Sequence, residues 1–207
     1  MKAILFDLDN TLYPPERQLF NLIDRRINDY MQQVVGIAAG DVDGLRRRYW
    51  QDYGVTLQGL IRHHGVDPED YLYYVHDVDV TSRLVPDPEL RLALAALPYR
   101  RFIFTNGSHC HVQRVLSALA LEGLFEEVFD IRVAAYLPKP RKEPYLRILH
   151  RLGLEATDCA MVEDTVINLQ PAKELGMRTI LVGPPPAPDY VDARVDSVHQ
   201  VAQGLVG

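Results

Sequence analysis

The chain has 207 residues, 47% of them hydrophobic, and carries a formal net charge of −6 at pH 7. A chain of this length and composition can bury a substantial core, as one domain or as one domain with an insertion. The acidic balance argues against general affinity for nucleic-acid polymers, because binding to a phosphate backbone needs a basic surface.

The first predicted element is a strand over residues 2–6, whose sequence KAILF is a continuous apolar run of the kind covered on both faces. This run ends at two carboxylates, Asp7 and Asp9. From residue 16 to about 97 the apolar residues recur at helical spacing, and glycine and proline breaks divide the stretch into four or five short helices.

Beyond residue 98 the pattern changes to strands that alternate with helices. Strands are predicted in the segments RRFIFTNGS, EEVFDIRV, DCAMVEDT and MRTILVG, and helices over residues 110–121, 144–152 and 167–175. Such alternation is typical of right-handed βαβ crossovers and a parallel sheet. We therefore predict a doubly wound α/β fold, with a core domain of residues 1–14 and 98–207 and an inserted α-helical domain of residues 15–97.

Polar residues gather where the predicted strands end. They are Asp7 and Asp9, Thr105 and Asn106, Lys139, and Glu163 and Asp164. Ligands of open parallel sheets bind beyond the carboxyl ends of the strands, so these side chains are expected to share one crevice. Clustered acids repel one another unless a cation lies among them. An all-oxygen acidic site is expected here, with no His or Cys nearby, and such a site favours Mg²⁺.

In order along the chain, the segments DLDNT, FTNGS, PKPRKEPY and VEDTVINLQPAKELGMRTILVG resemble the four motifs of the haloacid dehalogenase superfamily. The resemblance spans nearly the whole chain and implies a Rossmann-like core with a small helical cap. It also implies a phosphomonoesterase in which Asp7 attacks the phosphorus to form an aspartyl-phosphate. Asp9 would protonate the leaving oxygen and later activate water.

The same resemblance implies how the cofactor and the substrate are bound. Asp7, Asp164 and the backbone carbonyl of Asp9 would ligate Mg²⁺. The phosphoryl oxygens would be held by three further groups, the hydroxyl of Thr105, the backbone amide of Asn106 and the side chain of Lys139.

Three residues around these motifs have supporting or competing roles. Glu163 stands where Asp is frequent, so a contact with Lys139 or with a metal-bound water is an alternative to direct ligation. Asn168 is expected to orient the acidic loop. Lys142 competes with Lys139 for the third motif, but the family spacing fits better from Lys139.

The helical insertion lies where the family has its cap. The segments YWQDYGVTLQGL and VPDPELRLALAALPYRRFIFTNGS, together with NTLYP, resemble the pyrimidine 5′-nucleotidase group. That resemblance implies a pyrimidine nucleoside 5′-monophosphate as substrate. Another small phosphate ester, such as a sugar phosphate, is the alternative. Tyr49, Trp50 and Tyr53 are expected to pack between helices, with stacking on a base as the second possibility. Arg46–Arg48 is expected to be a solvated helix face, from which one arginine can reach a distal group of the substrate.

Two other function classes are compatible with the fold. A haloacid dehalogenase would use Asp7 to displace halide, but halide leaves without a proton and such enzymes lack the second aspartate, Asp9. A non-catalytic interaction protein would use the acidic pocket as a switch, which Asp9, Lys139 and the cap argue against.

The remaining expectations concern the setting of the protein. Cys110 and Cys159 are too few for a disulfide framework and are expected to be reduced. The pairs His63–His64 and His109–His111 lack a third ligand at metal-site spacing, so surface or hydrogen-bonded histidines are expected. No long apolar span or signal peptide is evident, which favours a cytoplasmic protein without membrane contact, as a monomer or weak homodimer.

Overall fold

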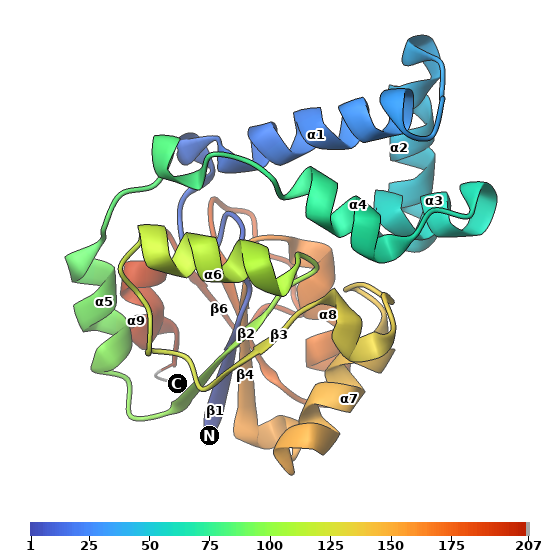
Figure 1. The fold of residues 1–207 in the computed structure, drawn as a ribbon. Helices are drawn as coiled ribbons and strands as arrows, with labels where there is room; N and C mark the ends of the chain where they lie inside the picture. Colours follow the sequence, from blue (N-terminus) through green and yellow to red (C-terminus); the bar gives the residue numbers. More distant parts are fainter. Residues whose placement is uncertain (206–207) are drawn as a thin grey trace.

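Six parallel strands form the centre of the computed structural model, which describes residues 1–205 (Figure 1). Their order in the sheet is β3-β2-β1-β4-β5-β6. The strands are β1 (Ala3–Phe6), β2 (Arg100–Phe104), β3 (Glu127–Phe129), β4 (Cys159–Glu163), β5 (Arg178–Val182) and β6 (Ala193–Val195). The predicted doubly wound α/β class is confirmed.

Two details of the sheet differ from the sequence prediction. The segment EEVFDIRV is a strand only over β3, because Asp130 accepts a hydrogen bond from the backbone N–H of Arg132 (3.0 Å) and caps a 3₁₀ turn, η3 (Ile131–Ala134). The edge strand β6 was not predicted. It has three residues and is defined by pairing with β5, which a short sequence window does not reveal.

Helices cover both faces of the sheet. Along β1, Ile4 and Phe6 face one side and pack with α5 (Pro88–Ala95), α6 (His109–Ala118) and α9 (Val201–Leu205). Ala3 and Leu5 face the other side and pack with α7 (Lys142–Leu152) and α8 (Val166–Leu175). This alternation explains the continuous apolar run of the first strand, since every residue of β1 is buried.

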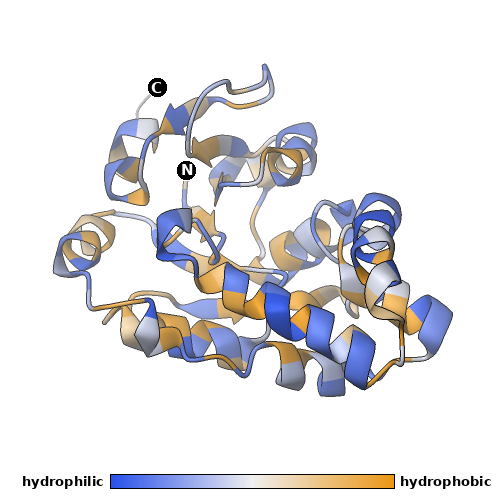
Figure 2. Ribbon diagram, turned by 90° about the horizontal axis from the view of Figure 1, so that it is seen from above, coloured by the Kyte–Doolittle hydropathy of each residue, from blue (hydrophilic) through white to orange (hydrophobic). Residues whose placement is uncertain are grey.

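The chain between β1 and β2 is helical, as predicted. Its elements are η1 (Pro15–Arg17), α1 (Leu19–Gln33), α2 (Ala39–Tyr53), α3 (Thr56–His64), α4 (Pro68–Val75), η2 (Val80–Ser82) and α5. In Figure 1, α1–α4 stand above the carboxyl edge of the sheet, and Figure 2 shows these helices with blue and orange residues on different sides. None of the helices within residues 1–205 has the length and apolar character that a membrane crossing requires.

The hydrophobic clusters divide this helical stretch into two parts. Ile23, Tyr30 and Leu72 belong to a cluster formed mainly by α1–α4, whereas Leu90 and Leu94 of α5 belong to the cluster on the sheet. We propose that the cap comprises α1–α4, which is narrower than the predicted domain of residues 15–97. On this view α5 is part of the core, because its buried side chains pack against the sheet.

Polar contacts tie the cap to the core near the carboxyl edge. The guanidinium of Arg132, in η3, pairs with Glu69 of α4 (2.5 Å), and the hydroxyl of Tyr136 donates to the same carboxylate (2.5 Å). The side-chain amide of Gln58, in α3, donates to the carbonyl of Tyr136 (2.7 Å). These contacts fasten α3 and α4 to the segment that leads to Lys139.

The packing of α2 on α3 depends on Gly59. A Cβ atom at Gly59 would lie 2.0 Å from the ring of Tyr49, whereas Gly44, within α2, has nothing within 4 Å. We expect Gly59→Ala to lower the free energy of unfolding by about 1–3 kcal/mol, because the ring must move. The matched change Gly44→Ala should raise it by about 0.5–1 kcal/mol, because alanine favours a helix. Urea unfolding of both variants checks this, and equal effects would contradict it.

Candidate active site

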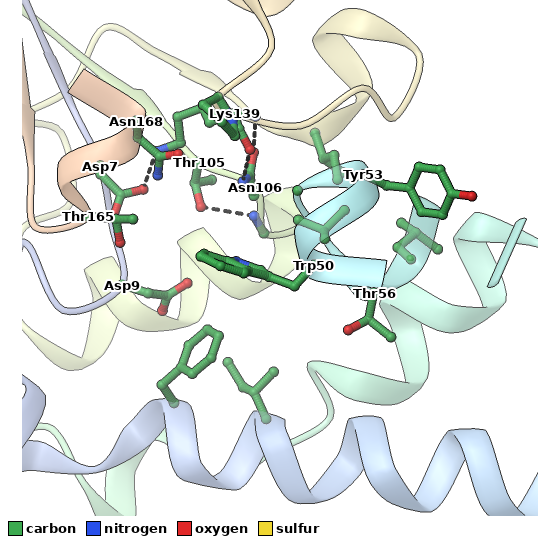
Figure 3. A pocket seen from close by; sticks show the side chains of 18 of the residues that line it. Asp7, Asp9, Trp50, Tyr53, Thr56, Thr105, Asn106, Lys139, Thr165 and Asn168 are labelled. Atoms are coloured by element: carbon green, nitrogen blue, oxygen red, sulfur yellow. Dashed lines mark hydrogen bonds and ion pairs between the residues drawn. The ribbon is translucent and has the colours of Figure 1, made fainter. Parts of the chain in front are cut away.

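Strands β1, β2 and β4 are neighbours in the sheet, so the residues at their carboxyl ends meet at one edge (Figure 3). There they line a cavity of about 590 Å³ that lies between the sheet and the cap. All eight residues named from the sequence line it, namely Asp7, Asp9, Thr105, Asn106, Lys139, Glu163, Asp164 and Asn168. The structure thus brings the predicted set together, while the individual roles remain predictions.

Lys139 is the buried cation of this site, with only 2% of its surface exposed. Its ammonium group donates to Asp7 Oδ1 (2.6 Å), to Glu163 Oε2 (2.6 Å) and to the carbonyl of Phe104 (2.9 Å). An ammonium has three donors, and all three are used. Burial alone would lower the pKa of Lys139, but attraction to the two carboxylates outweighs it and raises the pKa above its usual value.

The site contains more carboxyl groups than the single ammonium of Lys139 can neutralise. Burial, and next the charge of Glu163, raise the pKa of Asp7 to about 7. Burial likewise raises the pKa of Glu163 to about 7 against the attraction of Lys139. The pKa of Asp164 rises to about 6, through burial and then the charge of Asp7. The site therefore has an excess of negative charge that a bound cation would relieve.

The donor set suits a hard cation such as Mg²⁺. One oxygen each of Asp7, Glu163 and Asp164 lie within 4.8 Å of one another. The two oxygens of Glu163 already accept from Lys139 Nζ and from the backbone N–H of Thr165 (3.1 Å). The contact with Lys139 is one of the two roles left open for Glu163, and it leaves Asp7 and Asp164 as the better metal ligands.

Asp9 has partners that the sequence did not reveal. Its Oδ1 accepts hydrogen bonds from the hydroxyl of Tyr13 (2.6 Å) and from Nε2 of His111 (2.7 Å). Burial alone would raise the pKa of Asp9, but the charge and hydrogen bond of His111 and the hydrogen bond of Tyr13 outweigh it and leave the pKa below its usual value. The expectation that no histidine lies near the acids is therefore wrong, because the first turn of α6 places His111 at the end of β1.

The side chain of Asn106 positions the segment that carries Lys139. Its Oδ1 accepts from the backbone N–H of Lys139 (2.8 Å), and its Nδ2 donates to the carbonyl of the same residue (3.2 Å). The hydroxyl of Thr105 accepts from the backbone N–H of Gly107 (2.9 Å). Contacts of these residues with a phosphoryl group remain predictions.

The residues with supporting or competing roles are also placed. Asn168 is buried and faces the cavity, and its backbone carbonyl accepts from the hydroxyl of Tyr145 (2.6 Å). The ammonium of Lys142 lies outside the cavity and pairs with Glu174 (2.6 Å). Lys139 and not Lys142 therefore reaches the acidic residues.

The cap supplies the other wall of the cavity. Trp50, which is 55% exposed, extends from α2 into the cavity, where Phe20 and Ile23 of α1 also lie (Figure 3). Tyr49 is buried and packs between α2 and α3, as expected. Arg46 also lines the cavity, but its guanidinium is paired with Asp24 (2.5 Å).

The histidines of the cap are hydrogen-bonded, as expected. Nε2 of His63 lies 2.8 Å from the hydroxyl of Tyr53, and Nε2 of His64 lies 3.0 Å from that of Tyr49. They take no part in the acidic site.

Comparison with known proteins identifies the family. A model of the haloacid dehalogenase-like hydrolases matches residues 1–176, so the chain belongs to that hydrolase family. Glyceraldehyde 3-phosphate phosphatase of Methanocaldococcus jannaschii is 26% identical over 197 residues, covering 88% of this chain and 85% of that protein. Phosphate metabolism protein 8 of Saccharomyces cerevisiae is 24% identical over 197 residues, covering 87% of this chain. This chain spans only 61% of the length of the yeast protein.

Solved structures share the fold over the whole chain. A phosphatase of the same superfamily from Thermococcus onnurineus superposes with a TM-score of 0.67 at 20% identity, covering 100% of this chain and 99% of that one. L-2-haloacid dehalogenase of Xanthobacter autotrophicus superposes with a TM-score of 0.64 at 18% identity, covering 100% of both chains. One fold therefore carries both chemistries.

The raised pKa values predict how metal affects stability. In the absence of metal, the carboxyl groups of Asp7, Glu163 and Asp164 hold more protons in the folded protein than in the unfolded chain between about pH 4 and pH 7. These three acids therefore lower stability as pH rises through that window. Mg²⁺ binds the ionised acids, so its stabilising effect should grow over the same window. At roughly 100-fold excess over its Kd, it should add about 2.7 kcal/mol near pH 8 and little near pH 5.

Thermal unfolding with EDTA or with Mg²⁺ at each pH measures this difference, and the subtraction cancels other titrating groups. Asp164→Asn should remove most of the Mg²⁺ effect near pH 8. A Mg²⁺ effect that is constant across the pH range would contradict the proposed ligand set.

Proposed function

We propose that this haloacid dehalogenase-like hydrolase is a Mg²⁺-dependent phosphomonoesterase that forms an aspartyl-phosphate on Asp7. The observation that carries the proposal is the ion pair between the buried carboxylate of Asp7 and Lys139. Asp9 and Asp164 line the same cavity. This arrangement combines a nucleophile, a fixed cation, a second carboxyl group and a metal ligand. The phosphatase named from M. jannaschii supports this class of reaction.

In the first half-reaction, an Asp7 oxygen forms a bond to phosphorus while the bond from phosphorus to the ester oxygen breaks. The leaving oxygen takes a proton from Asp9. The low pKa of Asp9 means that this carboxyl is ionised in the free protein. An incoming phosphate dianion raises the pKa of a neighbouring carboxyl and so favours the protonated form needed here.

In the second half-reaction, water attacks the phosphorus of the aspartyl-phosphate and gives its proton to Asp9. The bond between phosphorus and the Asp7 oxygen breaks, which releases inorganic phosphate and restores both side chains for another turnover. Lys139 offsets the charge of Asp7 in both steps, because its ammonium lies 2.6 Å from Oδ1. Mg²⁺, when bound, neutralises charge on the phosphoryl oxygens and aligns them with the nucleophile.

A haloacid dehalogenase would share the nucleophile but not the need for Asp9. Halide leaves without a proton, whereas an alkoxide needs an acid. In this protein Asp9 lines the cavity and has two hydrogen-bond donors that orient it. Those contacts favour phosphate-ester hydrolysis over displacement of halide.

For the substrate we propose a small phosphate ester with a flat group, with a pyrimidine nucleoside 5′-monophosphate as the preferred candidate. The apolar wall formed by Phe20, Ile23 and Trp50 suits such a group. The helical insertion and the NTLYP sequence support the same choice. Another small phosphate ester, such as a sugar phosphate, is the alternative, and the glyceraldehyde 3-phosphate in the name of the M. jannaschii relative supports it.

The nucleophile is tested by Asp7→Asn. We expect the wild-type protein to hydrolyse p-nitrophenyl phosphate with Mg²⁺ and to carry a phosphoryl adduct at residue 7 after acid quenching. The variant should fold but show neither, because an amide does not form the acyl-phosphate. Mass spectrometry and steady-state assays check this, with the exposed Asp189→Asn as control. Substantial turnover by the Asp7 variant would rule out covalent catalysis.

The substrate is tested by Trp50→Ala and a panel of phosphorylated metabolites. If the indole stacks on a base, KM for uridine 5′-monophosphate should rise about tenfold, because such stacking contributes about 1–3 kcal/mol per base. KM for glycerol 2-phosphate, which has no flat group, should stay within about twofold on the same reasoning. Tyr73→Ala, at an 82% exposed site outside the cavity, is the control. Equal changes for both esters would contradict base stacking.

A further inference from the structure

The two oxygens of Asp9 have different surroundings. Oδ1 accepts both hydrogen bonds, from Tyr13 and from His111, and the two donors are themselves buried. No donor within residues 1–205 is bonded to Oδ2, and the carboxylate is directed into the cavity (Figure 3). Fixing one oxygen of a carboxylate determines where the other points.

His111 is fully buried, and within residues 1–205 the polar partner of its side chain is Asp9. Its Nδ1 has no hydrogen-bond partner among the described residues. A buried polar atom without a partner costs about 1–3 kcal/mol, so packing alone does not account for a histidine here. Because a carboxylate only accepts, the Nε2 atom must carry the proton in this contact.

The helix that carries His111 is rigidly placed. Ser108 caps its first turn by accepting from the backbone N–H of His111 (3.3 Å), and Val112 and Val115 bury the helix against the sheet. The imidazole is therefore held by the core independently of the loop that contains Asp9.

A histidine at the end of the cap also packs against the imidazole of His111. The ring of His76, which follows α4, stacks on that of His111 with centroids 4.7 Å apart and an angle of 24°. The Nδ1 atom of His76 lies 2.9 Å from the carbonyl of Leu72, and Arg114 of α6 donates to the carbonyl of His76. Burial and then the charge of His111 lower the pKa of His76 to about 3, so this ring is neutral.

We propose that His111 is a positioning residue for Asp9, and that His76 ties this positioning to the cap. The hydrogen bond to Oδ1 aims Oδ2 at the leaving oxygen of the substrate, and the stacked ring of His76 prevents His111 from turning away. The inference rests on the proposed function, because it assigns to Asp9 the exchange of a proton with the substrate.

The kinetic test compares two esters in single-turnover formation of the phosphoenzyme. p-Nitrophenyl phosphate releases a phenolate that needs no proton, whereas glycerol 2-phosphate releases an alkoxide that does. His111→Leu should slow the step for glycerol 2-phosphate by roughly tenfold more than for the aryl ester. His111→Gln should recover part of the loss, because its amide N–H can donate to Oδ1.

Two further variants separate positioning from general damage. His76→Ala should reproduce part of the selective loss, whereas His76→Phe, which keeps a stacked ring, should not. His109→Leu, at an exposed position of the same helix, should leave both esters unaffected. Equal slowing of both esters by His111→Leu, or a change in KM alone, would overturn the inference.

A spectroscopic readout keeps the inference testable without catalysis. The imidazole proton on Nε2 of His111 should give a downfield NMR signal protected from exchange, and Asp9→Asn should shift or abolish it. If the wild type formed no phosphoenzyme from either ester, the proposed function would fail. An unchanged signal in Asp9→Asn would instead refute the contact of His111 with Asp9.

Discussion

The contact of Lys139 with Asp7 and Glu163 is the interaction on which the site depends. A buried ammonium or carboxylate without a partner is strongly destabilising, and removing one member of such a group costs about 3–5 kcal/mol. Lys139 lies between two carboxylates that would otherwise repel each other and pairs with both. Asn106, at the end of the neighbouring strand, holds the backbone of Lys139 in place. The strand ends and the segment before α7 are thus held in one arrangement. The remaining negative charge makes the cavity suitable for a metal ion, whose positive charge would offset that of a bound phosphate.

The two aspartates after β1 differ because their surroundings differ. Asp7 faces Lys139 and other carboxyl groups, and burial raises its pKa to about 7. Asp9, two residues later, faces His111 and Tyr13, which lower its pKa despite burial. The pKa values of the two carboxyl groups therefore already differ in the free protein, before any ligand binds. This separation suits a nucleophile that is activated by cations and a second carboxyl that exchanges protons.

The cap contributes to the site in two physically distinct ways. Its α1 and α2 helices provide apolar and aromatic side chains that line the cavity. We propose that this wall limits water and selects the shape of the substrate. The end of α4 reaches the core itself, where His76 stacks on His111 and Glu69 pairs with Arg132. These contacts join the cap to the core beside Asp9, and on the proposed role of His111 they connect the position of the cap to the chemistry.

Local sequence determined the α/β class, the helical insertion and the ordered acidic, threonine and lysine positions, because each is encoded within a few residues of a strand end. The alternation of apolar runs and helical periods also located most elements. Tertiary structure decided the contacts between residues that are far apart in the sequence, which no short sequence segment contains. His76 and His111 are 35 positions apart, and their stack exists only because the residue that follows α4 lies against α6. In the same way, the assignment of α5 to the sheet, the pairing that creates β6 and the contact of Glu163 with Lys139 arise from surfaces formed by distant segments.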